Sequence, residues 1–298
     1  MLVAGATGYI GRRLALELSA GPTPVRCLAR DPSRARDLER AGCELVRGDV
    51  LDSASLGTAL AGVRTAYYLV HSMGRGSGGG FAERDARGAE NFADAAGAAG
   101  AERIVYLGGL SGGGSEHLES RHRTAGALAG SGVPLSYLRA AAVIGGGSES
   151  FRVVYYLVKR LPMMITPRWT ETRTQPIAIA DVIAYLVAAG DLPEALGREI
   201  EIGGPQVTTY GGMMDAMAQA FGRRPRPRLP VPVLTPRLSS LWVGLVTPVD
   251  VGVARPLIEG LSVETVVRDR SGMDLFDVET TPLAEAMAAA VRELELER

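Results

Sequence analysis

The sequence predicts an α/β fold in which helices cover a doubly wound parallel sheet, with a smaller cap region attached. Short apolar runs alternate with helical patterns over the first two thirds of the chain, as is typical of a parallel sheet. A glycine-rich turn over residues 5–11 joins the first run to the first helical pattern. The composition, 46% hydrophobic and 22% charged over 298 residues, provides ample apolar material for a full core.

The glycine-rich turn points to a dinucleotide site. A strand is expected over residues 2–4, and a helical pattern with Leu14, Leu16 and Leu18 follows the turn. A strand, a glycine turn and a helix form the Rossmann fingerprint, whose glycines allow a tight turn, close approach of a pyrophosphate and close helix packing. Free N–H groups at the helix start would bind the phosphates. The cofactor-binding residues expected here are Gly5, Thr7, Gly8, Tyr9, Ile10 and Gly11.

The residue after the second strand bears on which dinucleotide is bound. Residues 24–29 form that strand, and Arg30 follows where an NAD-binding protein has an acidic residue that holds the ribose. Together with Arg12, Arg30 suits the 2′-phosphate of NADP(H). Asp31, one place later, keeps NAD(H) open, and a solvated loop arginine is the alternative interpretation of Arg30. We expect NADP(H) in preference to NAD(H).

Two further strand ends add to the expected site. The third strand covers residues 44–50 and ends with Asp49 and Val50 on the adenine side, although Asp49 could equally cap the next helix. The fourth strand, residues 66–70, ends at Val70. His71 follows it at the edge where the nicotinamide would rest. A histidine that hydrogen-bonds its own turn is the alternative.

The alternation continues along the chain. The expected elements are a helix over 81–99, a strand over 103–107, a helix over 117–129, a strand over 135–138, helices over 151–161 and 182–189 (the latter capped by Asp181), a strand over 198–202 and a helix over 210–221. Glycine-rich stretches at 74–80 and 108–114 are expected to act as lids, or else as plain linkers. The Rossmann domain is predicted to cover 1–145, its sheet completed by residues 177–202, and the cap to cover 146–176 and 203–298.

Several stretches resemble one family. The glycine turn, Tyr68-Leu69-Val70-His71-Ser72-Met73, residues 103–110 and Thr166-Pro167-Arg168-Trp169 are similar to the atypical short-chain dehydrogenases/reductases, and among them to the NmrA-like, YbjT-like NAD(P)H-binding proteins. The resemblance implies a Rossmann fold that binds NAD(P)H. It also implies, for catalytic members of the wider superfamily, a serine after the fifth strand and Tyr-x-x-x-Lys in the next helix.

The chain departs from that catalytic pattern. Ser111 follows the fifth strand, but the matching helix has His117 in place of the tyrosine and Arg121 in place of the lysine. Histidine can donate a proton near neutral pH, whereas arginine can hold a ribose but stays protonated. The catalytic candidates are therefore Ser111, His117, Arg121 and His71, and loss of turnover is the competing interpretation.

These features predict an oxidoreductase that transfers hydride from NADPH to a small hydrophobic carbonyl, enone or quinone held under the cap. Two alternatives stay open. One is a non-catalytic NADP(H)-binding sensor or structural protein. The other is a redox-neutral isomerase or epimerase with bound nucleotide.

Composition argues against other classes. The net charge of −1 gives no basic excess for a nucleic-acid partner. The two cysteines, Cys27 and Cys43, form neither a disulfide framework nor a metal site, and we expect a cytoplasmic protein. Proline and charged residues interrupt the apolar segment 238–261, so we expect a contact between two copies of the chain there rather than a membrane span.

Overall fold

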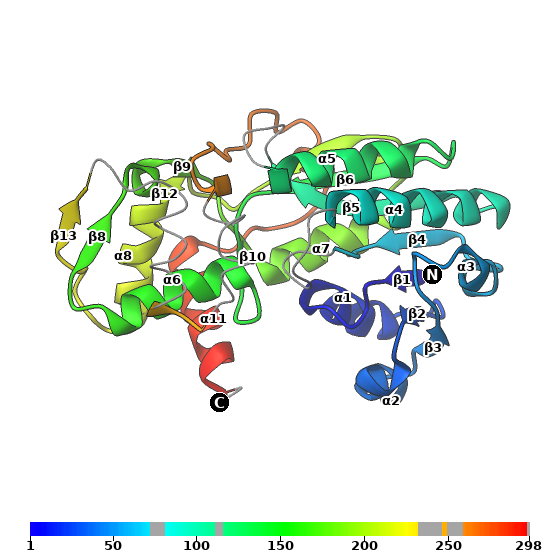
Figure 1. Ribbon diagram of the computed structural model, residues 1–298, viewed down its shortest axis with the longest axis horizontal. Helices are drawn as coiled ribbons and strands as arrows, with labels where there is room; N and C mark the ends of the chain where they lie inside the picture. The colour runs from blue at the N-terminus through cyan, green and yellow to red at the C-terminus, as the bar shows by residue number, and fades with distance from the viewer. Residues whose placement is uncertain (72–80, 111–115, 232–245, 249–258, 297–298) are drawn as a thin grey trace.

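The computed structural model describes residues 1–71, 81–110, 116–231, 246–248 and 259–296, and its centre is a seven-stranded sheet (Figure 1). The strands run parallel in the order β11-β6-β5-β4-β1-β2-β3. They are β1 (Leu2–Ala4), β2 (Arg26–Ala29), β3 (Glu44–Arg47), β4 (Thr65–Tyr68), β5 (Arg103–Gly109), β6 (Leu135–Ala140) and β11 (Glu199–Ile202). The strand order turns back between β1 and β4, and open parallel sheets bind their ligands at such a switch point. The predicted α/β fold is confirmed.

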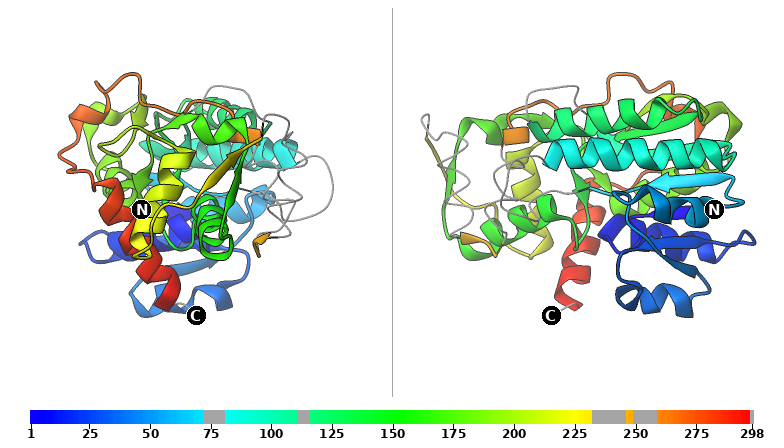
Figure 2. Two further views of the ribbon diagram at one scale, coloured as in Figure 1. Left: turned by 90° about the vertical axis from the view of Figure 1, so that its left-hand side faces the viewer. Right: turned by 45° about the vertical axis from the view of Figure 1, so that its right-hand side comes forward.

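Helices cover both faces of the sheet. On one face lie α3 (Ser53–Leu60), α4 (Phe81–Ala98) and α5 (Glu116–Ala129), which bury Leu56, Phe92 and Leu128 against the strands. On the other face lie α1 (Tyr9–Ser19), α2 (Arg36–Arg40) and α7 (Ile179–Ala189), with Leu14 and Leu186 in their core. In Figure 1 and in the right-hand view of Figure 2, α4 and α5 lie side by side at the top, and α1 lies below the sheet.

A third core belongs to the cap. Helices α6 (Glu149–Arg160), α8 (Tyr210–Ala220) and α11 (Leu283–Leu296) pack together around large side chains such as Phe151, Tyr155 and Met287. Three two-stranded sheets and four short 3-10 helices complete the described chain. They are β7 (Val143–Ile144) with β10 (Ile177–Ala178), β9 (Arg173–Thr174) with β12 (Thr208–Thr209), β8 (Met164–Thr166) with β13 (Arg228–Pro230), η1 (Pro32–Ala35), η2 (Arg168–Glu171), η3 (Pro193–Ala195) and η4 (Met273–Leu275). The boundaries expected between the Rossmann domain and the cap stay a prediction.

One local expectation is wrong. Asp181 does not cap a helix that begins at residue 182, because α7 begins at Ile179 and Ala178 is its N-cap. The buried Asp181 carboxylate instead accepts the backbone N–H of Thr281 at 2.8 Å and its hydroxyl at 2.7 Å. Both donors lie 100 positions away in the sequence, so these bonds hold the segment before α11 against α7.

The expectations about a membrane span, a homodimer contact, the glycine-rich lids and Ser111 can be compared with the structure only within the described residues. No helix within the described ranges is long and apolar enough to cross a membrane. Most of the segment 238–261, on which the homodimer prediction rests, lies outside the described residues, as do the stretch 74–80, most of the stretch 108–114, and Ser111.

Candidate dinucleotide site

The turn between β1 and α1 requires glycine at two positions. Gly5 has a φ of +88°, and a β-carbon there would lie 2.6 Å from the carbonyl oxygen of Leu69. A β-carbon on Gly11 would overlap the carbonyl group of Gly5, so helix α1 can pack this close to β1 only with glycine. The Gly8 N–H donates to the Gly5 carbonyl oxygen at 2.9 Å and closes the turn.

The start of α1 is open to an anion. No side chain caps the helix, and its first turn contains no acidic residue. Thr7 and Gly8 are exposed, and a β-carbon on Gly8 would lie 3.2 Å from its nearest neighbour, the Gly5 carbonyl oxygen. The chain therefore does not need glycine at position 8 for packing as strictly as at positions 5 and 11. Uncapped N–H groups and the positive end of the helix dipole fit a pyrophosphate.

The side chain of Tyr9 is held by the last helix of the chain. Its hydroxyl donates to both carboxylate oxygens of Glu293 at 3.0 Å, and Arg13 forms an ion pair with the same carboxylate. The backbone N–H of Gly146 donates to Glu293 Oε2 at 3.0 Å. One carboxylate of α11 thus joins the start of α1 to the loop after β7.

Two arginines share a cleft beside this turn. Arg30 follows β2 and Arg47 ends β3, and the two line an open cleft of about 400 Å³ together with Gly48, Asp49, Asp52 and Ser55. Both arginines are exposed, and within the described ranges neither forms an ion pair. A pair of unpaired guanidinium groups fits the 2′-phosphate of NADP(H).

The carboxylates around the cleft are committed to backbone donors. Asp49 accepts the N–H of Leu51 at 3.0 Å, and Asp52, rather than Asp49, caps α3 by accepting the N–H of Ala54 at 3.2 Å. Asp31 accepts the N–H and the hydroxyl of Ser33, and these bonds lower the pKa of Asp31. Because these three carboxylates accept hydrogen bonds from neighbouring residues, the positive charges of Arg30 and Arg47 are left to bind an anionic ligand.

Arg12 has another role in this structure. Its guanidinium forms an ion pair with Asp37 and donates to the carbonyl oxygen of Arg34 at 2.7 Å. Arg47, not Arg12, shares the cleft with Arg30. The contribution of Arg12 to the phosphate site stays a prediction.

Polar side chains gather at the carboxyl ends of β4 and β5. His71 Nδ1 lies 3.9 Å from Oδ2 of Asp85, a buried residue of α4. Arg121 of α5 donates to the carbonyl oxygen of Leu107 at 2.9 Å, near the end of β5. Two of the residues predicted from sequence, His71 and Arg121, thus lie at one edge of the sheet.

The surroundings of His71 make it a stronger acid. Burial of the imidazole, of which 26% stays exposed, lowers the pKa of His71, and the positive charge of Arg121 lowers it further. Asp85 acts in the opposite direction. The lowering influences dominate, so the protonated imidazole gives up its proton more readily than an ordinary histidine.

The remaining residues predicted from sequence differ in burial and in how far the structure describes them. Val50 is buried, and its carbonyl oxygen accepts a hydrogen bond from Asn91 at 3.0 Å. Val70 is half-buried and follows β4. His117 belongs to α5, but its side chain lies outside the described part of the molecule.

Sequence reasoning missed Arg47 and Asp85. Arg47 pairs in register with Ala29, so it ends its strand beside the residue that precedes Arg30. Asp85 stands four residues before Ala89 and seven before Phe92, which places a carboxylate on the apolar face of α4. An acidic residue on a buried helix face was the signal that could have revealed it.

A comparison with protein families indicates which ligand the first half of the chain binds. Residues 5–142 match the model of a family described as NAD(P)H-binding. Residues 5–142 form an NAD(P)H-binding domain. This domain contains the glycine turn, both arginines of the cleft and the polar residues at the ends of β4 and β5.

Two curated relatives match part of the chain. The chain is 36% identical over 63 residues to an NAD(P)H azoreductase of Xenophilus azovorans, a match that covers 21% of this chain and 22% of the relative. It is 32% identical over 107 residues to the photosystem II assembly factor Ycf39 of Cyanophora paradoxa, covering 36% and 33%. The chain therefore spans a third or less of the length of each of these two curated relatives.

One solved structure shares the fold of nearly the whole chain. An NADPH-dependent quinone oxidoreductase of Escherichia coli, complexed with NADPH, matches with a TM-score of 0.76 at 19% identity, covering 96% of this chain and 98% of the other. The Rossmann fold implied by the family resemblance is thus confirmed, and the solved structure shares the fold of the cap as well. The narrower NmrA-like assignment stays a prediction.

Proposed function

We propose that the chain is an NADPH-dependent reductase of small hydrophobic carbonyl compounds, enones or quinones. The observation that carries the proposal is the placement of His71 beside Asp85 and Arg121, at the sheet edge where the NAD(P)H-binding domain receives its ligand. A proton donor of lowered pKa at this edge suits the reduction of a carbonyl group, which needs one hydride and one proton.

The residues of the chain divide the work. The N–H groups at the start of α1 bind the pyrophosphate, and Arg30 and Arg47 bind the 2′-phosphate. NADPH supplies the hydride when it is bound. His71 gives its proton to the substrate oxygen, and Asp85 orients the imidazole ring.

The names of related proteins support this substrate class. One relative is named an NAD(P)H azoreductase, and one solved structure is of an NADPH-dependent quinone oxidoreductase complexed with NADPH, so both names join a nicotinamide cofactor to the reduction of a conjugated compound. Ser111 and His117 remain candidates for further contacts at the reacting end. The two buried, unpaired cysteines accord with a reducing, cytoplasmic location.

The test is a binding titration followed by a turnover screen. We expect calorimetry to give tighter binding of NADPH than of NADH, and the nicotinamide absorbance to fall in the presence of one or more quinones or enones. His71→Gln should reduce this turnover at least tenfold without changing NADPH affinity. His122→Gln, an exposed change on α5, is the matched control and should leave both unchanged. Full activity in His71→Gln would refute the role of His71.

A second candidate is a protein that binds NADP(H) and assists assembly without turnover. Two observations favour it. Arg121, which stands in place of the lysine of the catalytic pattern, already donates to the carbonyl oxygen of Leu107. One relative is named an assembly factor. Tight NADPH binding with no NADPH consumption across a broad panel of quinones, enones and aldehydes would select this candidate over the reductase.

A further inference from the structure

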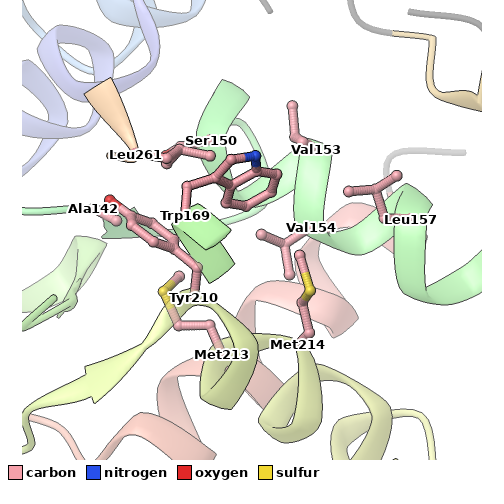
Figure 3. Close-up of a pocket in the computed structure, with 10 residues that line it drawn as sticks. All are labelled: Ala142, Ser150, Val153, Val154, Leu157, Trp169, Tyr210, Met213, Met214 and Leu261. Carbon is pink, nitrogen blue, oxygen red and sulfur yellow. The ribbon is translucent and has the colours of Figure 1, made fainter. Parts of the chain in front are cut away.

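The cap contains a small apolar pocket between α6 and α8, next to η2. Val153, Val154 and Leu157 line it from α6, and Tyr210, Met213 and Met214 line it from α8 (Figure 3). Ala142 also borders the pocket and lies two residues after β6, on the carboxyl side of the sheet. The pocket therefore reaches the carboxyl side of the sheet, the side on which His71 follows β4.

One polar group in this pocket lacks a partner. The indole N–H of Trp169 is buried, and the described part of the chain offers it no hydrogen-bond acceptor. Figure 3 shows the indole ring in the middle of the pocket, with its nitrogen on the edge toward Val153. Buried polar groups are nearly always paired, so an unpaired donor at the centre of an apolar pocket calls for an explanation.

The other polar side chains of the pocket are satisfied. The Tyr210 hydroxyl interacts with Thr174 and Thr265, which also bond to each other at 2.9 Å. The hydroxyl of Ser150 lies 3.0 Å from that of Ser148. The pocket therefore presents one donor on an otherwise apolar surface.

Water is a poor partner for this donor. The free volume is about 20 Å³, room for roughly one water molecule, and a buried water needs two to four polar partners. Trp169 would provide only one. A carbonyl oxygen on an apolar ring needs a single donor and places carbon against the remaining walls. Unbranched methionine side chains can move aside to admit such a ring.

We propose that the Trp169 pocket binds the substrate of the reductase, a flat conjugated carbonyl compound whose oxygen accepts the indole N–H. This inference rests on the proposed function, because it names the place and the recognition chemistry of the same substrate. Trp169 is a specificity residue in this proposal. It distinguishes a carbonyl compound from a hydrocarbon of equal shape.

The experiment compares 1,4-naphthoquinone with naphthalene by calorimetry, in the presence of saturating NADP+ so that no reduction occurs. Trp169→Phe keeps an aromatic ring and removes the N–H. It should weaken naphthoquinone binding about three- to tenfold and leave naphthalene binding unchanged. The variant should also unfold at a higher temperature than the wild type without ligand, because it removes an unpaired buried donor.

A second variant tests the pocket itself. Val154→Phe fills the space and should weaken both probes at least tenfold, with NADP+ affinity unchanged. Val207→Phe, the same change at an exposed cap position, is the control and should alter neither.

The outcomes separate the two proposals. Wild-type affinity for naphthoquinone in both Trp169→Phe and Val154→Phe would overturn the pocket and leave the reductase proposal standing. Binding in the Trp169 pocket without turnover of any quinone would support the pocket and overturn the reductase. Absence of both binding and turnover in the wild type would overturn both.

Discussion

At the scale of single residues, the side chains that matter stand on neighbouring strand ends. Arg30 and Arg47 come from different strands, yet they line one cleft because β2 and β3 run parallel in register. His71 follows β4, and Arg121 of α5 donates to the carbonyl oxygen of Leu107 in β5, so both lie at the same edge of the sheet. Parallel strands bring their carboxyl ends to one edge, so residues far apart in the chain act on one ligand.

The arginine pair predicts a selective loss of NADPH binding. Arg30→Ala and Arg47→Ala should each weaken NADPH about ten- to a hundredfold, since each removes a charge-assisted hydrogen bond to the 2′-phosphate. NADH, which lacks that phosphate, should lose much less. The measurement is a pair of calorimetric titrations for each variant.

Arg64→Ala is the control for these arginine changes. Arg64 is exposed, precedes β4 and pairs with Glu102 at 2.8 Å, so its loss should affect neither cofactor. An equal loss of NADPH and NADH affinity in Arg30→Ala and Arg47→Ala would remove the 2′-phosphate assignment.

The neighbours of His71 predict two opposite shifts. Asp85→Asn removes the charge that raises the pKa of His71, so that pKa should fall further. Arg121→Gln removes a charge that lowers it, so the pKa should rise. Nuclear magnetic resonance titration of the imidazole protons measures both.

The pH dependence of turnover follows with a definite sign. The lowered pKa of His71 means that its proton-bearing form is lost at a lower pH than in an ordinary histidine. Turnover should therefore decline from acidic toward neutral pH, with a midpoint shifted down in Asp85→Asn and up in Arg121→Gln. Shifts in the reverse directions would contradict the assigned roles of the two charges.

At the scale of elements, the glycines of the first turn have separable roles. Gly11→Ala should destabilise the fold by about 2 kcal/mol, because the β-carbon meets the Gly5 backbone. Gly8→Val should lower the unfolding temperature less than Gly11→Ala, because its β-carbon would lie 3.2 Å from the Gly5 carbonyl oxygen rather than overlapping it. It should nevertheless abolish NADPH binding, because its side chain would occupy the pyrophosphate position. Thermal unfolding and calorimetry distinguish the two effects.

Gly57→Ala in α3 provides the contrast. Its β-carbon would meet no atom within 4 Å, so alanine there should stabilise the helix by about 0.5–1 kcal/mol.

A Gly8→Val protein that binds NADPH normally would show that the phosphates lie elsewhere.

Most elements were predictable from sequence because their signals are local. The glycine turn, the apolar strands and the periodic helices each depend on residues within one segment, so the parallel sheet followed from the order of these segments. The role of Asp181 was mistaken because its partner, Thr281, is 100 positions away. Arg47 and Asp85 were missed for a related reason. Their significance lies in which strand end or helix face each shares with the site, and this depends on the packed fold.

At the scale of the whole molecule, Glu293 joins the last helix to the first. Glu293→Ala removes the acceptor of Tyr9, Arg13 and the Gly146 N–H, and should lower the free energy of unfolding by about 2 kcal/mol. It should also weaken NADPH binding several-fold, because the start of α1 loses its support. Chemical denaturation and calorimetry measure the two effects.

Glu295→Ala is the matched control on the same helix. Glu295 is exposed and lies 3.7 Å from Lys159, and such surface pairs contribute at most about 1 kcal/mol. Equal effects of the two substitutions would show that Glu293 has no special part in supporting α1.

The contact between Tyr9 and Glu293 also has a consequence for synthesis. The two residues are 284 positions apart, so all of the chain between them must be translated before the second can reach the first. The strands of the NAD(P)H-binding domain can pair while the ribosome is still adding the cap, as domains fold in order of their emergence. The start of α1 gains its final support only when the last helix has left the ribosome.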